Sequence, residues 1–150
     1  MLFPISRHPR LGFRSMELSA GCAVLVSDPG ALDVIVTDNM SGDVVTGVCC
    51  GLVGGPFMVG GGAFGEDCAV FGPVHGPQAA LAGQGVANPV GCLQSAVMLL
   101  GYVGLHEAAD RVRRAVEATV AKGDVGILTP DMGGRGTTKG FVGAVKAALR

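Results

Sequence analysis

The sequence predicts an α/β fold in which a partial sheet is flanked by helices. Short β-branched or apolar runs alternate with longer helical patterns, which is typical of α/β domains. Hydrophobic residues make up 49% of the 150 residues and the net charge is −1, which excludes an intrinsically disordered chain. Only two runs read as strands, whereas a sheet has about five or six on average. We therefore expect part of an α/β domain, with an incomplete sheet.

The first third of the chain is expected to hold a helix, a strand and a second helix. Residues 17–26 are mostly small and apolar, and they predict a helix that ends at the turn formers of residues 27–30. The β-branched run 33–37 predicts a buried strand, followed by a turn over residues 39–43. Residues 44–52 predict a helix, although their β-branched content leaves a strand open.

The middle of the chain alternates between glycine-rich loops and short apolar runs. Residues 52–62 are read as loop and turn, and the short run 69–71 as a second strand. A loop rich in glycine and proline follows over residues 72–89, and Pro89 marks the start of a helix. This helix is apolar on nearly every side, so we expect it to be buried, with Leu93, Val97 and Leu100 inside.

The clearest amphipathic helix is predicted over residues 107–122, ended by Gly123. Its apolar stripe consists of Ala108, Val112, Ala115, Val116 and Val120. The opposite face carries the i,i+4 pairs Glu107–Arg111, Asp110–Arg114 and Arg113–Glu117. Each such pair contributes only about 0.2–0.5 kcal/mol, so these pairs mark a solvated face and not a functional site.

A loop over residues 129–136 leads into a final helix. Thr138 is the predicted N-cap, because its hydroxyl can accept a backbone N–H of the first turn. One apolar face is formed by Phe141, Val145 and Leu149.

Charge and residue composition argue against nucleic acid and against a membrane as partners of this chain. The 11 basic and 12 acidic residues are scattered and nearly balanced, so the chain has no electrostatic footprint for nucleic acid. From Cys68 to His106 no residue is ionised, which raises the possibility of a membrane span. Glycines and prolines interrupt this stretch before the ~20 apolar residues that a span requires. We expect a buried interior or subunit interface there, and no membrane.

The N-terminal segment and the cysteines bear on the cellular compartment. Residues 1–16 contain Arg7, Arg10 and Arg14 and no acidic residue, a composition that suits a mitochondrial presequence or, alternatively, an irregular exposed terminus. The five cysteines form no Cys-x-x-Cys motif, and their number is odd. They are expected to be small buried thiols in a reducing compartment, without disulfides or a zinc site.

The stretch from His75 to Pro89 carries the most specific motif, HGPQAALAGQGVANP. It resembles the cofactor loop of the isocitrate/isopropylmalate dehydrogenase family, whose pattern is HGSAPDIAGKGIANP. Further motifs follow the family order within residues 32–43, 51–55, 65–67, 104–111 and 128–138. The resemblance covers about residues 28–150 and implies an incomplete dehydrogenase fold of this family. Residues 1–16 match nothing in it, so residues 17–150 are taken as the C-terminal portion of such a domain.

The resemblance implies an NAD site that is partly preserved. His75, Gly76 and Asn88 occupy the positions that contact the adenosine end of NAD in the family. Ala80 replaces the aspartate that hydrogen-bonds the ribose hydroxyls, and a methyl group cannot do so. Without the family motif, His75 and Asn88 would be interpreted as turn residues of a glycine-rich loop.

The resemblance also implies a site for Mg²⁺ or Mn²⁺ that has lost most of its carboxylates. Asp43 stands at the first of two metal-binding positions one helical turn apart, and Gly47 stands at the second. Ser19 aligns loosely with a third ligand. Since glycine cannot ligate, one carboxylate of three remains. Asp43 could alternatively be an acidic residue near a helix N-terminus.

This pattern of losses is similar to the regulatory subunits of mitochondrial NAD-dependent isocitrate dehydrogenase. Family members are more than twice as long, so the resemblance implies a truncated subunit. Such a subunit is expected not to be catalytic alone. It is expected to work beside a catalytic subunit or as a homodimer, in the mitochondrial matrix. The alternatives are an active fragment completed by a partner, a fragment of another 2-hydroxy-acid dehydrogenase such as isopropylmalate dehydrogenase, and a non-enzymatic remnant or binding module.

Overall fold

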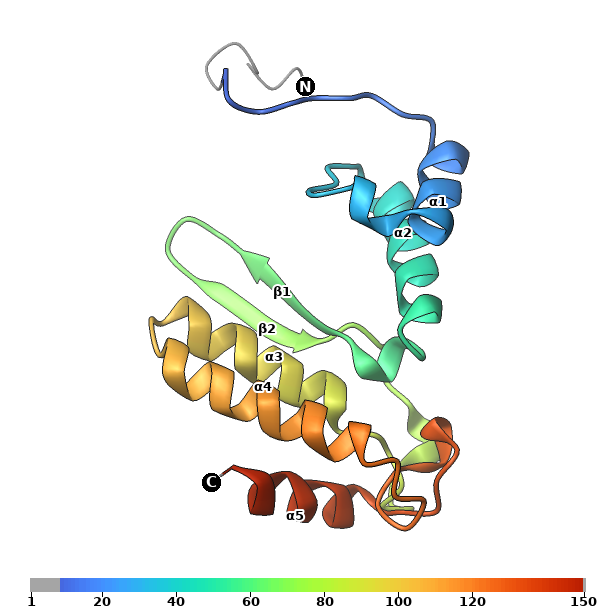
Figure 1. The fold of residues 1–150 in the computed structure, drawn as a ribbon, viewed down its shortest axis with the longest axis vertical. Coiled ribbons are helices and arrows are strands. Elements are labelled where there is room, and N and C mark those ends of the chain that lie inside the picture. The colour runs from blue at the N-terminus through green and yellow to red at the C-terminus, as the bar shows by residue number, and fades with distance from the viewer. Residues whose placement is uncertain (1–8, 150) are drawn as a thin grey trace. The chain divides into compact units, whose positions relative to one another are not determined.

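The computed structural model describes residues 9–149, which divide between Cys49 and Cys50 into two compact units. The first unit holds helix α1 (Leu18–Ser27), a 3-10 turn and most of helix α2 (Asn39–Leu52). The second holds strands β1 (Gly60–Phe64) and β2 (Ala69–Pro73) and helices α3 (Val90–Tyr102), α4 (His106–Ala121) and α5 (Thr138–Ala148). The expected mixture of helices with an incomplete sheet is confirmed, and Figure 1 shows these elements along the chain.

The first unit corrects two predictions. Residues 33–37 form no strand, and Val34 and Val36 are 79% and 71% exposed, because a β-branched run becomes a strand only beside a second strand and none pairs with it in the described part of the chain. Residues 39–43 form the first turn of α2 instead of a separate turn. Asp38 accepts the backbone N–H of Ser41 at 2.9 Å and so caps a helix that begins at Asn39, before the start predicted at residue 44.

Strand β1 begins within residues 52–62, which the sequence predicts to be loop and turn, and it pairs antiparallel with β2. The register joins Gly60 to Pro73 and Phe64 to Ala69, and the N–H of Gly65 closes the connecting turn on the carbonyl of Cys68. Three successive glycines open β1, and they hide its strand character because glycine has low strand propensity. The predicted strand at 69–71 is confirmed within β2.

The second unit is layered, with the β1–β2 hairpin against α3, α3 against α4, and α4 against α5 (Figure 1). Its core lies between the last three helices and consists of Val90, Ala115, Val116, Phe141 and Val145, each at most 2% exposed. The predicted apolar stripe of α4 and the apolar face of α5 both contribute to it, so these two predictions are confirmed.

Three details of this unit differ from expectation. Helix α3 is not buried all round, since Leu99 and Tyr102 are 45% and 54% exposed, although the Tyr102 ring packs on Phe64 and Phe71 of the hairpin. The N-cap of α5 is Thr137, whose hydroxyl accepts the N–H of Gly140 at 3.0 Å, and not Thr138. The thiols are not all buried: Cys68 and Cys92 are exposed.

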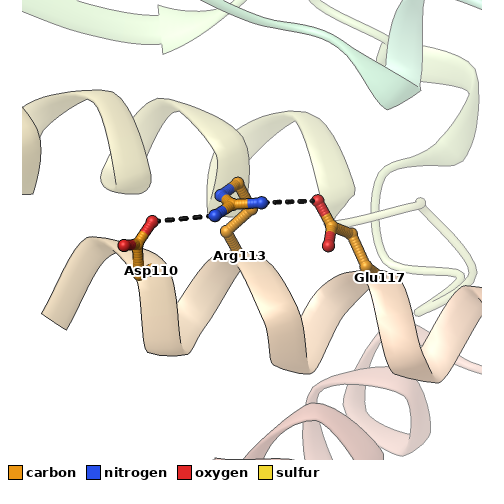
Figure 2. A network of polar contacts seen from close by, with 3 residues as sticks. All are labelled: Asp110, Arg113 and Glu117. Atoms are coloured by element: carbon orange, nitrogen blue, oxygen red, sulfur yellow. Dashed lines mark hydrogen bonds and ion pairs between the residues drawn. The ribbon is translucent and has the colours of Figure 1, made fainter. Parts of the chain in front are cut away.

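The solvated face of α4 is confirmed, and so is the predicted pair Arg113–Glu117, whereas Asp110 and Arg111 have other partners than predicted. Arg113 binds both Asp110, at 2.8 Å, and Glu117, at 3.3 Å (Figure 2). The hydrogen bond from Arg113 holds the pKa of Asp110 below its ordinary value of 3.8, so any stability this pair adds is present above that pH and is lost as the pH falls below it. Arg111 instead donates to the carbonyl of Leu149, which ties α4 to the end of α5.

Among the residues that the structure describes, no helix is both long and apolar enough to cross a membrane. Residues 1–8, which include Arg7 of the expected targeting segment, lie outside the described range.

Candidate functional site

The residues predicted to contact a nucleotide begin at the end of strand β2. The N–H of Val74 donates to the carbonyl of Val59 at 3.1 Å, which anchors the chain where the loop starts. The half-buried ring of His75 packs on the ring of Phe57, with centroids 4.4 Å apart. The Nδ1 atom of His75 lies 3.0 Å from the carbonyl oxygen of Gly76. The imidazole is thus held by an apolar neighbour, Phe57, and by the backbone carbonyl of the next residue, Gly76.

Gly76 and Ala80 lie in the exposed part of the loop. An added Cβ at Gly76 would meet no heavy atom within 4 Å, so the backbone there can be approached closely from outside. Ala80 belongs to a short 3-10 turn and offers no side-chain acceptor. Gly83 and Gly85 have φ angles of +77° and +67°, left-handed values that favour glycine. These two glycines let the loop turn twice before it reaches α3.

Asn88, the third predicted nucleotide contact, is buried, with 5% of its surface exposed. Its Oδ1 accepts the N–H of Val90 at 2.9 Å, at the start of α3. Its Nδ2 donates to Oδ2 of Asp131 at 2.8 Å and contacts the sulfur of Met58 at 3.4 Å. Both N–H donors of the amide are therefore engaged inside the protein. A nucleotide at this position is left with the backbone of Asn88.

The partners of Asn88 were not predicted from the sequence. Asp131 is 43 residues away along the chain, and its other oxygen, Oδ1, accepts the hydroxyl of Thr129 at 2.6 Å. Thr129 is fully buried. The TPD sequence at 129–131 does contain a local signal, since threonine, proline and aspartate favour turns. Nothing local indicates which residue Asp131 meets.

The same part of the loop is also held by the start of helix α5. The N–H of Thr138 donates to the carbonyl of Gly85 at 2.8 Å, and its hydroxyl donates to the carbonyl of Ala87 at 2.5 Å. A shallow groove of about 680 Å³ lies beside this junction. It is lined by Gln84, Gly85, Thr137, Thr138, Lys139 and Lys146, among others. Loop residues 85–88 are thus held by residues of the last fifth of the chain, in addition to the contacts of Asn88 with Met58 and Val90.

The predicted metal ligand, Asp43, is in the first unit, so the structure does not place it relative to residues 75–88, the loop predicted to bind a nucleotide. Asp43 and Gly47 are both exposed on α2, four residues apart and hence on one helical face. Ser19 is exposed on α1. No cluster of three or more histidine, cysteine, aspartate or glutamate residues occurs within residues 9–149. Because Mg²⁺ and Mn²⁺ require several oxygen ligands, these residues do not fit a complete metal centre.

Comparison with known proteins agrees with the motifs. A family model described as isocitrate/isopropylmalate dehydrogenase matches residues 6–145. The chain is 45% identical over 130 residues to an isocitrate/homoisocitrate dehydrogenase of Thermus thermophilus, covering 86% of the chain and 38% of the relative. It is 40% identical to a 3-isopropylmalate dehydrogenase of Archaeoglobus fulgidus, covering 95% and 43%.

A eukaryotic relative and a solved structure extend the likeness. The chain is 40% identical to a mitochondrial regulatory subunit of NAD isocitrate dehydrogenase from Dictyostelium discoideum, covering 92% of the chain and 38% of the relative. The crystal structure of isocitrate dehydrogenase from Methylococcus capsulatus superimposes with a TM-score of 0.87 at 31% identity, over 97% of this chain and 44% of that one. The chain therefore spans about two fifths of the length of the curated relatives it matches.

Proposed function

Because the chain belongs to the isocitrate/isopropylmalate dehydrogenase family, we propose that it forms part of a regulatory-type subunit of NAD-dependent isocitrate dehydrogenase. Members of this family oxidise a 2-hydroxy acid with NAD and decarboxylate the product. A divalent cation bound in such an enzyme would supply Lewis-acid chemistry to that reaction. This chain supplies the adenosine side of a nucleotide site, and it is not catalytic without a partner.

The observation that carries the proposal is Gly47. It stands one helical turn after Asp43 on an exposed face of α2, where a second carboxylate would complete a pair of metal ligands. With glycine there, the face presents a single carboxylate. We therefore assign no metal-dependent step to this chain.

Restoring the carboxylate tests this reading. We expect the variant Gly47→Asp to bind Mn²⁺ measurably, in the range of about 10⁻³ M typical of weak oxygen sites, while the wild type binds more weakly. Electron paramagnetic resonance of free Mn²⁺ measures both affinities. Space is not limiting, since an added Cβ at Gly47 meets no atom within 4 Å.

The matched control is Gly47→Ala. It removes the helix cost of glycine, about 0.5–1 kcal/mol, without adding a ligand, so it should stabilise α2 and leave Mn²⁺ binding at the wild-type level. If the wild type already binds Mn²⁺ as tightly as Gly47→Asp, the proposal that Gly47 deprives this chain of a metal site is wrong.

The nucleotide part of the proposal depends on His75 and Gly76. The His75 ring is held by Phe57, and the exposed Gly76 backbone lets a ligand approach closely. These groups, with the backbone of Asn88, fit the adenosine end of NAD, whose nicotinamide ring, at the other end of the cofactor, would supply the hydride acceptor of the reaction. Ala80 leaves the ribose hydroxyls without a carboxylate, so we expect weaker binding than in a chain with aspartate there.

We propose a catalytic isocitrate dehydrogenase subunit as the partner, and the mitochondrial matrix as the compartment. The stretch from Cys68 to His106 contains no ionised residue, and it leaves Val70 and Tyr102 69% and 54% exposed. Charged residues are depleted at the cores of subunit interfaces. The mitochondrial regulatory relative and the arginines near the N-terminus support the compartment.

One experiment tests partner and compartment together. The full chain, tagged at its C-terminus, is co-expressed in eukaryotic cells with a catalytic NAD-isocitrate dehydrogenase subunit. We expect to recover it from the matrix fraction bound to that subunit, with a changed KM for isocitrate. Recovery from the cytosol contradicts the proposed compartment. Recovery from the matrix without the catalytic subunit, or only as a homodimer, contradicts the proposed partner.

A second candidate substrate follows from the relative in Archaeoglobus fulgidus, which is named a 3-isopropylmalate dehydrogenase and is 40% identical. The two substrates share a 2-hydroxy acid and differ in the side group. If the recovered complex responds to 3-isopropylmalate and not to isocitrate, the second candidate replaces the first.

A further inference from the structure

The end of the nucleotide loop is joined to the C-terminal part of the chain through one carboxylate. Asp131 accepts Asn88 Nδ2 on one oxygen and the Thr129 hydroxyl on the other, at 2.8 and 2.6 Å. Both of its oxygens are engaged, and its partners are 5% and 0% exposed. Asp131 therefore has one orientation that satisfies two buried groups at once.

The side chain of Asn88, held by Asp131, also binds the backbone at the start of α3. Its Oδ1 holds the N–H of Val90 where α3 begins, and its Nδ2 also contacts Met58, beside the Phe57 ring that supports His75. Rotation of the Asn88 amide would break all three contacts together. The side chain of Asn88 thus acts as an internal brace between the loop and Asp131.

The start of α5 holds the preceding residues. Thr138 binds the carbonyls of Gly85 and Ala87 through its N–H and its hydroxyl. With Asp131 this makes two independent attachments from residues 129–138 to residues 85–88. No residue of the loop itself replaces either attachment.

We propose that Asp131 is a positioning residue of the nucleotide site: through Asn88 it fixes the backbone of residues 85–88 in the conformation that receives the adenosine end of the ligand. This inference rests on the proposed function for the identity of the ligand. The effect of Asp131 on the loop conformation does not depend on the proposed function, because it follows from the hydrogen bonds alone. Asp131 itself need not touch the nucleotide.

The amide and carboxylate can be exchanged between the two positions, which makes a sharp test. In Asp131→Asn an amide faces the amide of Asn88, and in Asn88→Asp two carboxylates face each other. In the double variant N88D/D131N the carboxylate at position 88 still accepts the Val90 N–H, and the amide at position 131 donates to it. The carbonyl oxygen of that amide can accept the Thr129 hydroxyl, so the network is restored with donor and acceptor reversed.

Two quantities are measured on the full chain: the dissociation constant for ADP by calorimetry, and amide hydrogen exchange at residues 85–88. We expect each single variant to weaken ADP binding by about tenfold and to accelerate exchange at these residues. The double variant should recover both. Single variants that behave like the wild type, or a double variant no better than the singles, overturn the proposal.

Thr119→Val serves as a control for general destabilisation. It removes another buried hydroxyl hydrogen bond, from Thr119 to the Ala115 carbonyl within α4. It should lower the melting temperature without changing exchange at 85–88 or ADP affinity. If Asp131→Asn does no more than this control, Asp131 has only a structural role and the proposal fails.

Failure of the proposed function gives a different result. If the wild type does not bind ADP at all, the nucleotide assignment is wrong. The exchange data still decide whether Asp131 fixes residues 85–88, and a single variant that does not fold is judged by whether the double variant folds again.

Discussion

Replacing Phe141 by alanine is expected to lower the free energy of unfolding by about 3–5 kcal/mol, the loss typical of a fully buried phenylalanine. Phe141 is 0% exposed in the core between α3, α4 and α5. Its ring contributes both apolar burial and the packing of α5, so its removal leaves a cavity among side chains that are themselves held by three helices. Urea unfolding followed by circular dichroism measures the change.

This loss is large because domains of this size are stable by only about 5–15 kcal/mol. A truncation at an exposed apolar position gives the comparison: Val103, 58% exposed after α3, should change stability by less than about 0.5 kcal/mol when replaced by alanine. Equal effects of the two substitutions would show that the helices do not pack around Phe141 as described.

Replacing Gly60 by alanine is expected to destabilise the contact between the hairpin and α3 by roughly 1–3 kcal/mol, the usual cost of overpacking. An added Cβ would lie 2.6 Å from the backbone nitrogen of Ser95 and 2.9 Å from the carbonyl carbon of Gln94. Both atoms belong to a helix backbone and cannot rotate away, so the strand or the helix must shift. Urea unfolding and proteolysis of the hairpin report the effect.

Gly72 is the matched control, because it lies in the same hairpin and an added Cβ there meets no heavy atom within 4 Å. Gly72→Ala should be neutral or stabilising, by up to about 1 kcal/mol, since alanine restricts the unfolded chain. The two variants are therefore predicted to differ in sign. A Gly60→Ala variant as stable as Gly72→Ala would contradict the close approach of β1 to α3.

Helices α4 and α5 could be predicted closely because their signals are local. The apolar stripe and the i,i+4 charges of α4 repeat with the helical period, and Gly123, with φ of +64°, follows its last turn. Even there one partner was not local: Arg113 bridges Asp110 and Glu117 within the helix, one of them its predicted i,i+4 partner, while Arg111 binds the carbonyl of Leu149 in the last part of the chain.

The strands show where local signals fail. The run 33–37 has the composition of a strand and forms none, whereas glycine-rich β1 forms one. A strand is stabilised by its neighbour, so its existence depends on residues elsewhere in the chain. β1 is defined by pairing with β2 and by the closeness of α3, which tolerates no side chain at Gly60.

The sequence by itself determined the family, because the family is a property of residue identity and order. It also located the loop predicted to bind a nucleotide, and it put glycine at position 47, the predicted position of the second metal ligand. Only the tertiary structure decided what Asn88 does with its side chain. The motif places it among nucleotide contacts, but its amide is buried and bound to Asp131, 43 residues away. Hydrogen bonds between distant segments depend on how helices and loops pack, and no local pattern records them.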